Sequence, residues 1–153
     1  MWEKIIELLG GKTLDLAIKF LANKFKRSGK AASLVDELKR NATICRLVVK
    51  CDGDPIQRGR KLSLATYRQL RDGGYPFDKV KKGPIPNYTT MQGTSVEFLA
   101  GKTLADALGN ISDRILEIQV ICETEDQPNH TDLKRRFQNL AQRLAVVIRF
   151  ASE

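Results

Sequence analysis

Apolar residues recur at helical spacing along most of the chain. Over residues 2–9 they stand at positions 2, 5, 6 and 9, the spacing of one helix face. The run 14–25 carries two apolar stripes, one of Leu16, Ala17 and Phe20 and the other of Leu14, Ile18, Leu21 and Phe25. A helix that is apolar on most sides is either central in a bundle or dipped in lipid. The pair Gly10-Gly11 is expected to break the chain between the two runs.

A third helix is predicted from Ser33, a good N-cap with Asp36 in a box-like arrangement, to about Lys50. The stretch Ile44–Val49 is rich in β-branched residues and is compatible with a strand, but the start signal and the length of the segment favour a helix. The sequence Asp-Gly-Asp-Pro at 52–55 then predicts a turn.

Residues 53–93 form a long connection. Ser63 is expected to cap a short helix at about 63–72, which Gly73-Gly74 closes. The remainder, with Pro76, Pro84 and Pro86, is predicted to be irregular. Loops of that length are usually functional or disordered.

Two long helices are predicted at the end of the chain. Thr94 and Glu97 have the spacing of a capping box, and the helix after them carries a stripe made of Leu104, Leu108, Ile111, Ile115, Ile118 and Cys122. The last helix is expected to start near 129–131, with a heptad-like stripe of Leu133, Phe137, Leu140, Leu144 and Val147.

The letters Gly-Lys-Thr-Leu occur twice, at 11–14 and at 101–104. A phosphate-binding loop needs a glycine five positions before its Gly-Lys and a preceding strand, whereas Ile6 and Val96 stand at those positions and no strand is indicated. Nucleotide hydrolysis is therefore disfavoured. Duplication fits better, because GKTL, ELKR and RLVV are followed in the same order by GKTL, DLKR and RLAVV. Chance similarity is the alternative, since the match is short and needs gaps.

These patterns predict one all-α domain over residues 1–153. We expect a four-helix bundle, with two helical hairpins that duplication would relate, at about 1–52 and about 94–153. The segment 53–93 would be a basic crossover rich in Pro and Gly that carries the short extra helix.

Composition adds a bias toward polyanionic partners. The chain has 42% apolar and 29% charged residues, a formal net charge of +8 and a pI of about 9.6. Such a surplus favours nucleic acid or an anionic membrane, although a soluble protein can simply be basic. No apolar run is long enough to span a bilayer, and no signal peptide is recognised. Three cysteines without a framework spacing favour free thiols and a cytoplasmic location.

No catalytic or metal-binding constellation stands out. His130 is the only histidine and is expected to be exposed at a helix start, with no arginine among residues 123–129 to complete a ribonuclease motif. The cysteines Cys45, Cys51 and Cys122 match no zinc spacing and are predicted to be core thiols. The acidic turn at residues 123–126 is predicted to be exposed and not to bind a cation. The sequence thus predicts neither an enzyme nor a cofactor, and no small-molecule substrate.

The crossover holds the strongest functional signal. Residues 58–82 contain eight cationic and two acidic side chains, with Tyr67, Tyr75, Phe77 and Tyr88 in or near the segment. Cations contact phosphates and aromatic rings stack on unpaired bases. The predicted nucleic-acid-binding residues are Arg58, Arg60, Lys61, Arg68, Arg71, Lys79, Lys81, Lys82 and Tyr67. Further basic clusters are Lys24, Lys26, Arg27 and Lys30, and the run 134–136. The alternative is that the cations are solvated and the aromatics anchor the connection.

The leading hypothesis is therefore a non-enzymatic accessory module that binds RNA or DNA through phosphates. A protein-interaction or oligomerisation module is the second. The third is a membrane-active effector that uses the amphipathic segment 2–27, with Trp2 and a trailing basic stretch as an interfacial anchor. The alternative interpretation of this segment is an ordinary core helix with a basic C-terminal end.

Overall fold

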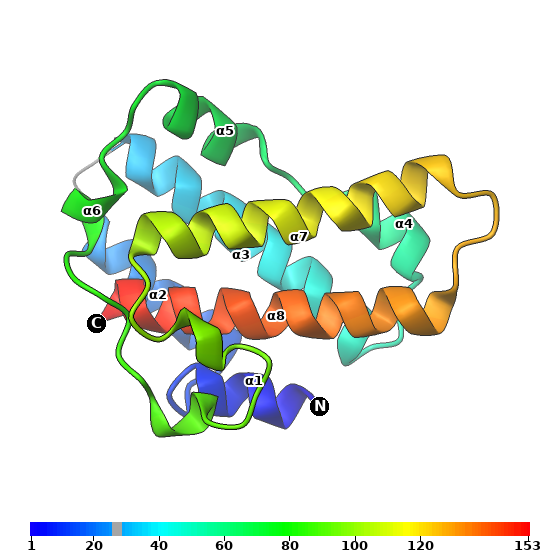
Figure 1. Ribbon diagram of the computed structural model, residues 1–153, viewed down its shortest axis with the longest axis horizontal. Coiled ribbons are helices and arrows are strands. Elements are labelled where there is room, and N and C mark those ends of the chain that lie inside the picture. Colours follow the sequence, from blue (N-terminus) through cyan, green and yellow to red (C-terminus); the bar gives the residue numbers. More distant parts are fainter. Residues whose placement is uncertain (26–28) are drawn as a thin grey trace.

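A computed structural model of the chain describes residues 1–25 and 29–153 and is all-helical over these residues, which confirms the predicted class (Figure 1). The elements are α1 (Trp2–Leu8), α2 (Leu14–Lys24), α3 (Gly29–Val49), α4 (Pro55–Gly59), α5 (Ala65–Asp72), α6 (Phe77–Val80), the short 3₁₀ turns η1 (Thr89–Met91) and η2 (Glu97–Leu99), α7 (Leu104–Thr124) and α8 (His130–Ser152).

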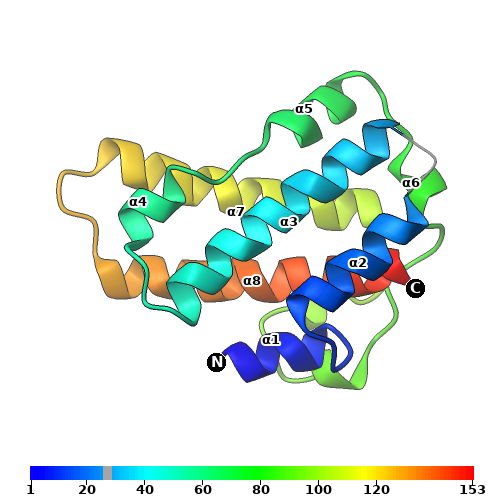
Figure 2. The same cartoon turned by 180° about the vertical axis from the view of Figure 1, so that it is seen from behind.

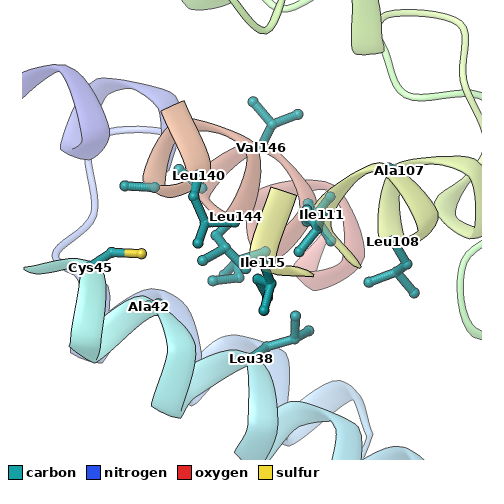
Figure 3. Packing of buried hydrophobic residues seen from close by; sticks show 14 of the residues in the cluster. Leu38, Ala42, Cys45, Ala107, Leu108, Ile111, Ile115, Leu140, Leu144 and Val146 are labelled. Atoms are coloured by element: carbon teal, nitrogen blue, oxygen red, sulfur yellow. The ribbon is translucent and has the colours of Figure 1, made fainter. Parts of the chain in front are cut away.

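Helix α8 is the centre of the packing. It contacts α1, α2, α3, α4 and α7, and the predicted stripe from Leu133 to Val147 is buried along its whole length. Five consecutive residues, 144–148, are all buried, so this part of α8 is enclosed on every side. Figure 3 shows Leu38 of α3, Ile115 of α7 and Leu144 of α8 pointing into the same core. The predicted stripe of α7 is buried as well.

The repeated Gly-Lys-Thr-Leu motif is a helix-start signal. Gly11 and Gly101 have left-handed backbones, with φ of 81° and 83°. The threonine hydroxyl then caps the helix: Thr13 Oγ1 accepts from Leu16 N at 3.3 Å, and Thr103 Oγ1 accepts from Asp106 N at 3.2 Å. The leucine that follows each threonine is buried. The motif therefore serves two helix N-termini and is not part of a strand-loop-helix phosphate site.

Replacing Thr103 by alanine is expected to lower the free energy of unfolding by about 1 kcal/mol, because a helix-start amide loses its acceptor. Urea unfolding monitored by circular dichroism measures the effect. The matched control is Thr131→Ala, an exposed threonine in the first turn of α8, which should change stability by less than about 0.5 kcal/mol. An equal loss in both variants would contradict the capping role.

Helix α2 is less buried than the sequence predicts. The two predicted stripes of α2 differ in burial: Leu14, Ile18 and Leu21 of one are buried, whereas in the other Ala17 is buried and Leu16 and Phe20 are 43% and 45% exposed. Helix α2 is therefore neither central nor fully covered. The apolar face of α1, including Trp2, is buried in the core. The predicted break at Gly10-Gly11 is confirmed, since both glycines have positive φ.

Two predicted helix starts are wrong. Helix α3 begins at Gly29 rather than Ser33, and the Ser33 hydroxyl donates back to Gly29 O. Helix α7 begins at Leu104. The Thr94–Glu97 pair belongs to the turn that leads into η2, where Glu97 Oε2 accepts from Gly93 N at 3.1 Å. The helical preference for 44–49 is confirmed. Helix α4, in a segment read as a polar connection, was not predicted.

The crossover is wrapped against the helical body. It passes from α4 over α5 to α6, along one long side of the molecule (Figures 1 and 2). Seven of its apolar residues are buried, namely Leu62, Leu64, Tyr67, Leu70, Phe77, Ile85 and Met91. Asn41 of α3 fixes the segment before α5, donating to Ser63 O and accepting from Ser63 N, both at 2.9 Å. These contacts make the crossover a folded layer.

Helix α5 has its N-terminus capped from another helix. The carboxylate of Glu37, a buried residue of α3, accepts from Thr66 N at 2.9 Å, Tyr67 N at 2.8 Å and the Ser63 hydroxyl at 2.7 Å. The α5 C-terminus closes as predicted at Gly73-Gly74, where Gly74 has a φ of 73° and Tyr75 N donates to Leu70 O. Both ends of α5 are therefore fixed.

Candidate nucleic-acid interface

The cations of the crossover are largely unpaired. Of the eight predicted basic residues, only Arg71 forms an ion pair among the described residues, with Asp72 at 3.1 Å. The other seven face no carboxylate within ion-pair distance in this part of the chain. An unpaired surface cation keeps its charge available for a phosphate.

The first group, residues 58–61, lies where the chain leaves α4. Arg60 donates from Nη2 to Cys122 O at 3.2 Å and so caps the C-terminal turn of α7. Arg40 of α3 donates from Nε to Lys61 O at 3.2 Å. This bond places a further guanidinium beside the group. Arg40 was not predicted as a site residue, and no local signal could have revealed it, because the contact joins two distant segments.

The second group lies on α5. Arg68 is exposed, and Arg71 lies over the Tyr67 ring at 5.6 Å. Tyr67 itself is a correction to the predicted set: the ring is only 8% exposed and stacks on Phe77 at 5.8 Å. With Phe77 and Arg71 against it, the Tyr67 ring is not available to stack on an unpaired base.

The third group, Lys79, Lys81 and Lys82, lies in and just after α6. Ile85, shortly after it, pairs with the start of α7: Ile85 N donates to Lys102 O and Gly101 N donates to Ile85 O, both at 2.8 Å. Arg60 lies at the C-terminal end of the same helix, whose 21 residues span about 30 Å. The structure therefore spreads the eight predicted cations in a row along the crossover and does not gather them into one cluster.

The other aromatic residues of the crossover anchor it. Tyr75 packs edge-on against the buried Phe77 at 5.3 Å. The Tyr88 hydroxyl donates to Glu153 Oε2 at 2.7 Å, and Arg149 lies 3.8 Å from the centre of the Tyr88 ring. Burial, with the neighbouring Glu153 carboxylate, raises the pKa of Tyr88 above its usual range. Tyr75 and Tyr88 therefore anchor the crossover to the helical body, which is the alternative to stacking on bases.

The remaining basic clusters contribute less. Lys24 and Lys30 are exposed, whereas Lys26, Arg27 and the predicted helix end at Ser28 lie outside the described residues. In the run 134–136 every cation is paired: Lys134 with Asp52 at 2.6 Å, Arg135 with Asp132, and Arg136 with Asp132 and Glu117. The hydrogen bond from Lys134 holds the pKa of Asp52 below its usual value.

A cavity of about 400 Å³ lies between the start of α3 and α5. Its walls include Lys30, Thr66, Gln69 and the half-buried Tyr75, and none of the described residues that line it is acidic. The cavity adjoins the second group of cations, because α5 provides both.

The residues considered for catalysis or metal binding do not gather. Cys45 and Cys122 are buried, and burial raises the pKa of both thiols, whereas Cys51 is exposed and not the core thiol that was predicted. His130 is exposed at the start of α8, as expected. In the part of the chain that the structure describes, no three His, Cys, Asp or Glu side chains stand where they could hold a metal ion. Among residues 1–25 and 29–153, none of the helices has the length and apolarity to cross a bilayer.

Sequence reasoning also missed an arginine group on the seam of α7 and α8. Arg136 and Arg143 are seven residues apart and so share a helix face, a signal that the sequence does contain. Arg114 joins them from α7, and this juxtaposition depends on the packing of the two helices.

Comparisons with protein-family models, with curated proteins and with solved structures gave no match to this chain.

Proposed function

We propose that this chain is a non-enzymatic, cytoplasmic helical module that binds nucleic acid through its phosphates, as an accessory subunit of a larger assembly. The observation that carries the proposal is the row of crossover cations without ion pairs, held against the helical body by buried residues. Fixed cations lose less conformational freedom on binding than those of a disordered arm.

The dimensions of the row suit a nucleic-acid backbone. Its ends are separated by about 30 Å, the length of α7. Nine base pairs of duplex span about the same distance, at about 3.4 Å per pair. Phosphate contacts position a protein without reading bases, so we expect weak sequence preference. The acid-free cavity beside α5 gives a single strand a further place to bind, with Tyr75 in its wall.

Salt dependence tests the proposal. Fluorescence anisotropy with short single- and double-stranded RNA and DNA, between about 50 and 200 mM salt, should give binding that weakens steeply with salt. The test variant replaces Lys61, Arg68 and Lys82 by glutamine. These cations are exposed, and none forms an ion pair among the described residues. If all three contact phosphates of a duplex, the slope of log K against log salt should become shallower by about 2.7.

The control variant replaces Lys4, Lys12 and Lys19 by glutamine, with the same loss of charge in and beside α1 and α2, outside the crossover. It should leave the slope nearly unchanged. Equal effects in both variants would mean that net charge, and not the row, attracts the polyanion. An absence of binding by the wild-type chain at low salt would reject the proposal.

A protein-interaction or oligomerisation module is the second candidate. It is favoured by Leu116 and Val120, one turn apart on α7 and 43% and 48% exposed. A stable oligomer in the absence of any polyanion would support it. Less evidence supports the membrane alternative, since the apolar face of α1 and one face of α2 are buried. The large apolar side chains that stay exposed in the described part of this segment are Met1, Leu16 and Phe20. Liposome binding that disappears when residues 1–27 are deleted would support that alternative.

We also propose that α2–α3 and α7–α8 are the two hairpins of a four-helix bundle and descend from one duplicated unit. The shared Gly-Lys-Thr-Leu start of α2 and α7, with the same capping threonine, supports this relationship. ELKR lies in α3 and DLKR lies in α8, so the second repeated motif also falls in the second helix of each pair.

A further inference from the structure

A small polar cavity opens on the seam between α7 and α8. Its volume is about 50 Å³, and its walls are Arg114 and Glu117 of α7 with Arg136, Asn139 and Arg143 of α8. All five side chains are polar, and three cations stand against one carboxylate.

The carboxylates near the cavity are already shared. Glu117 accepts from Arg114 Nη2 at 3.1 Å through one oxygen and from Arg136 Nη1 at 3.2 Å through the other. Asp132 pairs with Arg136 Nε at 3.0 Å and with Arg135. Asp113 lines the wider groove outside the cavity. Two carboxylates, Glu117 and Asp132, therefore already pair with Arg114, Arg136 and Arg135.

Among the described residues, Arg143 donates hydrogen bonds to neutral groups and forms no ion pair. It donates from Nε to Asn110 Oδ1 at 2.8 Å and from Nη1 to Asn139 O at 3.0 Å, and the guanidinium lies 5.3 Å from the centre of the Phe98 ring. Burial and the neighbouring Arg114 lower the pKa of Arg143, so the two cations are close enough to repel. Arg114 Nε is buried and has no hydrogen-bond partner among the described residues.

We propose that this cavity binds a compact oxyanion, namely a phosphate group. Positive charge that is partly desolvated and lacks a counter-charge is stabilised by an anion. Guanidinium donors match the oxygen geometry of phosphate. One water occupies about 10–15 Å³ by this measure, so 50 Å³ admits about four atoms of that size, as many as the oxygens of one phosphate.

The surroundings allow the phosphate to be free or to carry an organic group. The cavity shares Arg114, Glu117 and Arg136 with an open groove of about 680 Å³, whose other walls include the exposed Leu116 and Val120. A phosphate monoester can place its phosphate in the cavity and its organic part in this groove. None of these residues belongs to the crossover row, so the site does not depend on the proposed nucleic-acid binding.

Calorimetric titration of the full chain with inorganic phosphate, at constant ionic strength set by chloride, tests the proposal. We expect saturable binding to wild type and a phosphate-dependent rise in Tm. The variant Arg143→Gln should bind about tenfold more weakly or worse, because it removes a charged donor. Arg143→Lys keeps the charge without the planar donor pair and should fall between the two.

Two further variants separate a binding role from a structural one. Glu117→Gln removes the competing carboxylate and should tighten phosphate binding, an effect that mere loss of packing would not produce. The matched control is Arg135→Gln, an exposed arginine of α8 that also pairs with Asp132. It should leave the affinity unchanged.

Adenosine monophosphate, tested against adenosine, separates the two sources of the phosphate. Monophosphate binding at least as tight as that of inorganic phosphate, with none by adenosine, supports an esterified ligand, and binding of inorganic phosphate alone supports the free anion. The proposal is overturned if wild type binds neither phosphate. It is also overturned if Arg143→Gln and Arg135→Gln bind phosphate like wild type, or if the rise in Tm is the same in all variants.

Discussion

Replacing Glu37 by alanine is expected to lower the free energy of unfolding by about 3–5 kcal/mol. The carboxylate of Glu37 accepts three hydrogen bonds, from Ser63 Oγ, Thr66 N and Tyr67 N, at a position that is only 7% exposed. Hydrogen bonds to a charged group contribute about 1.5–3 kcal/mol each, and a buried donor that loses its acceptor adds a desolvation cost. Alanine leaves all three donors without that acceptor.

Chemical denaturation monitored by circular dichroism measures the loss. Glu37→Gln keeps one side-chain oxygen and should destabilise less than alanine. Asp36→Ala, at the exposed neighbouring position of α3, should stay within about 0.5 kcal/mol of wild type. In Glu37→Ala, amide exchange at the start of α5 should also accelerate. If Glu37→Ala cost no more than Asp36→Ala, the long-range cap would not contribute to stability.

The second large effect is expected at Gly59. A Cβ added at this position would lie 2.5 Å from Cys122 Sγ and 3.1 Å from Ile118 Cγ2, both side chains of α7. Gly59 ends α4, which packs against α7 and α8. Alanine therefore forces α4 away from α7, and overpacking of this kind costs about 1–3 kcal/mol. We expect Gly59→Ala to destabilise the protein by about 2 kcal/mol.

A double-mutant cycle identifies the clash. Cys122→Ala removes the sulfur atom and leaves the Cys122 Cβ at 3.7 Å from the added methyl, an ordinary contact. Gly59→Ala should then cost much less in the Cys122→Ala background than in wild type, with a coupling of about 1 kcal/mol or more. The control is Gly93→Ala, at an exposed glycine with no heavy atom within 4 Å of the added Cβ, where the cost comes from the positive φ. Additive costs of Gly59→Ala and Cys122→Ala would contradict the proposed contact.

The long helices could be predicted because their signals are local. In α7 and α8 the apolar residues repeat at helical spacing over five turns or more, and burial follows that repeat. The start of α7 was misplaced because Thr94 and Thr103 each precede an acidic residue at capping-box spacing, and the pattern alone does not rank them. The start of α3 was misplaced because Ser33 has the residue type of a cap but lies one turn inside the helix, where its hydroxyl donates to Gly29 O. Helix α4 is short and owes its place to Cys122 and Ile118, which lie about 60 positions away in the sequence.

The candidate site was predictable in its charge and not in its shape. The basic character of 58–82 depends only on residue types, and nucleic-acid binding by these residues stays a prediction. Tyr67 was misjudged because the ring is covered by Phe77 and Arg71, a result of how the crossover folds back. The excess positive charge of the α7–α8 seam could not be predicted from the sequence. Arg114 and Arg143 are 29 positions apart and come together only when the two helices pack.

The central position of α8 has a consequence for synthesis on the ribosome. Helices α1, α2 and α3 all pack against α8, yet residues 50–129 lie between α3 and α8 in the sequence. The apolar faces with which the first three helices contact α8 therefore stay without that contact while the intervening stretch is translated. At about 5–20 residues per second the delay is of the order of 4–16 s, long enough for a chaperone to bind these faces. The N-terminal helices complete their packing only after α8 has left the exit tunnel.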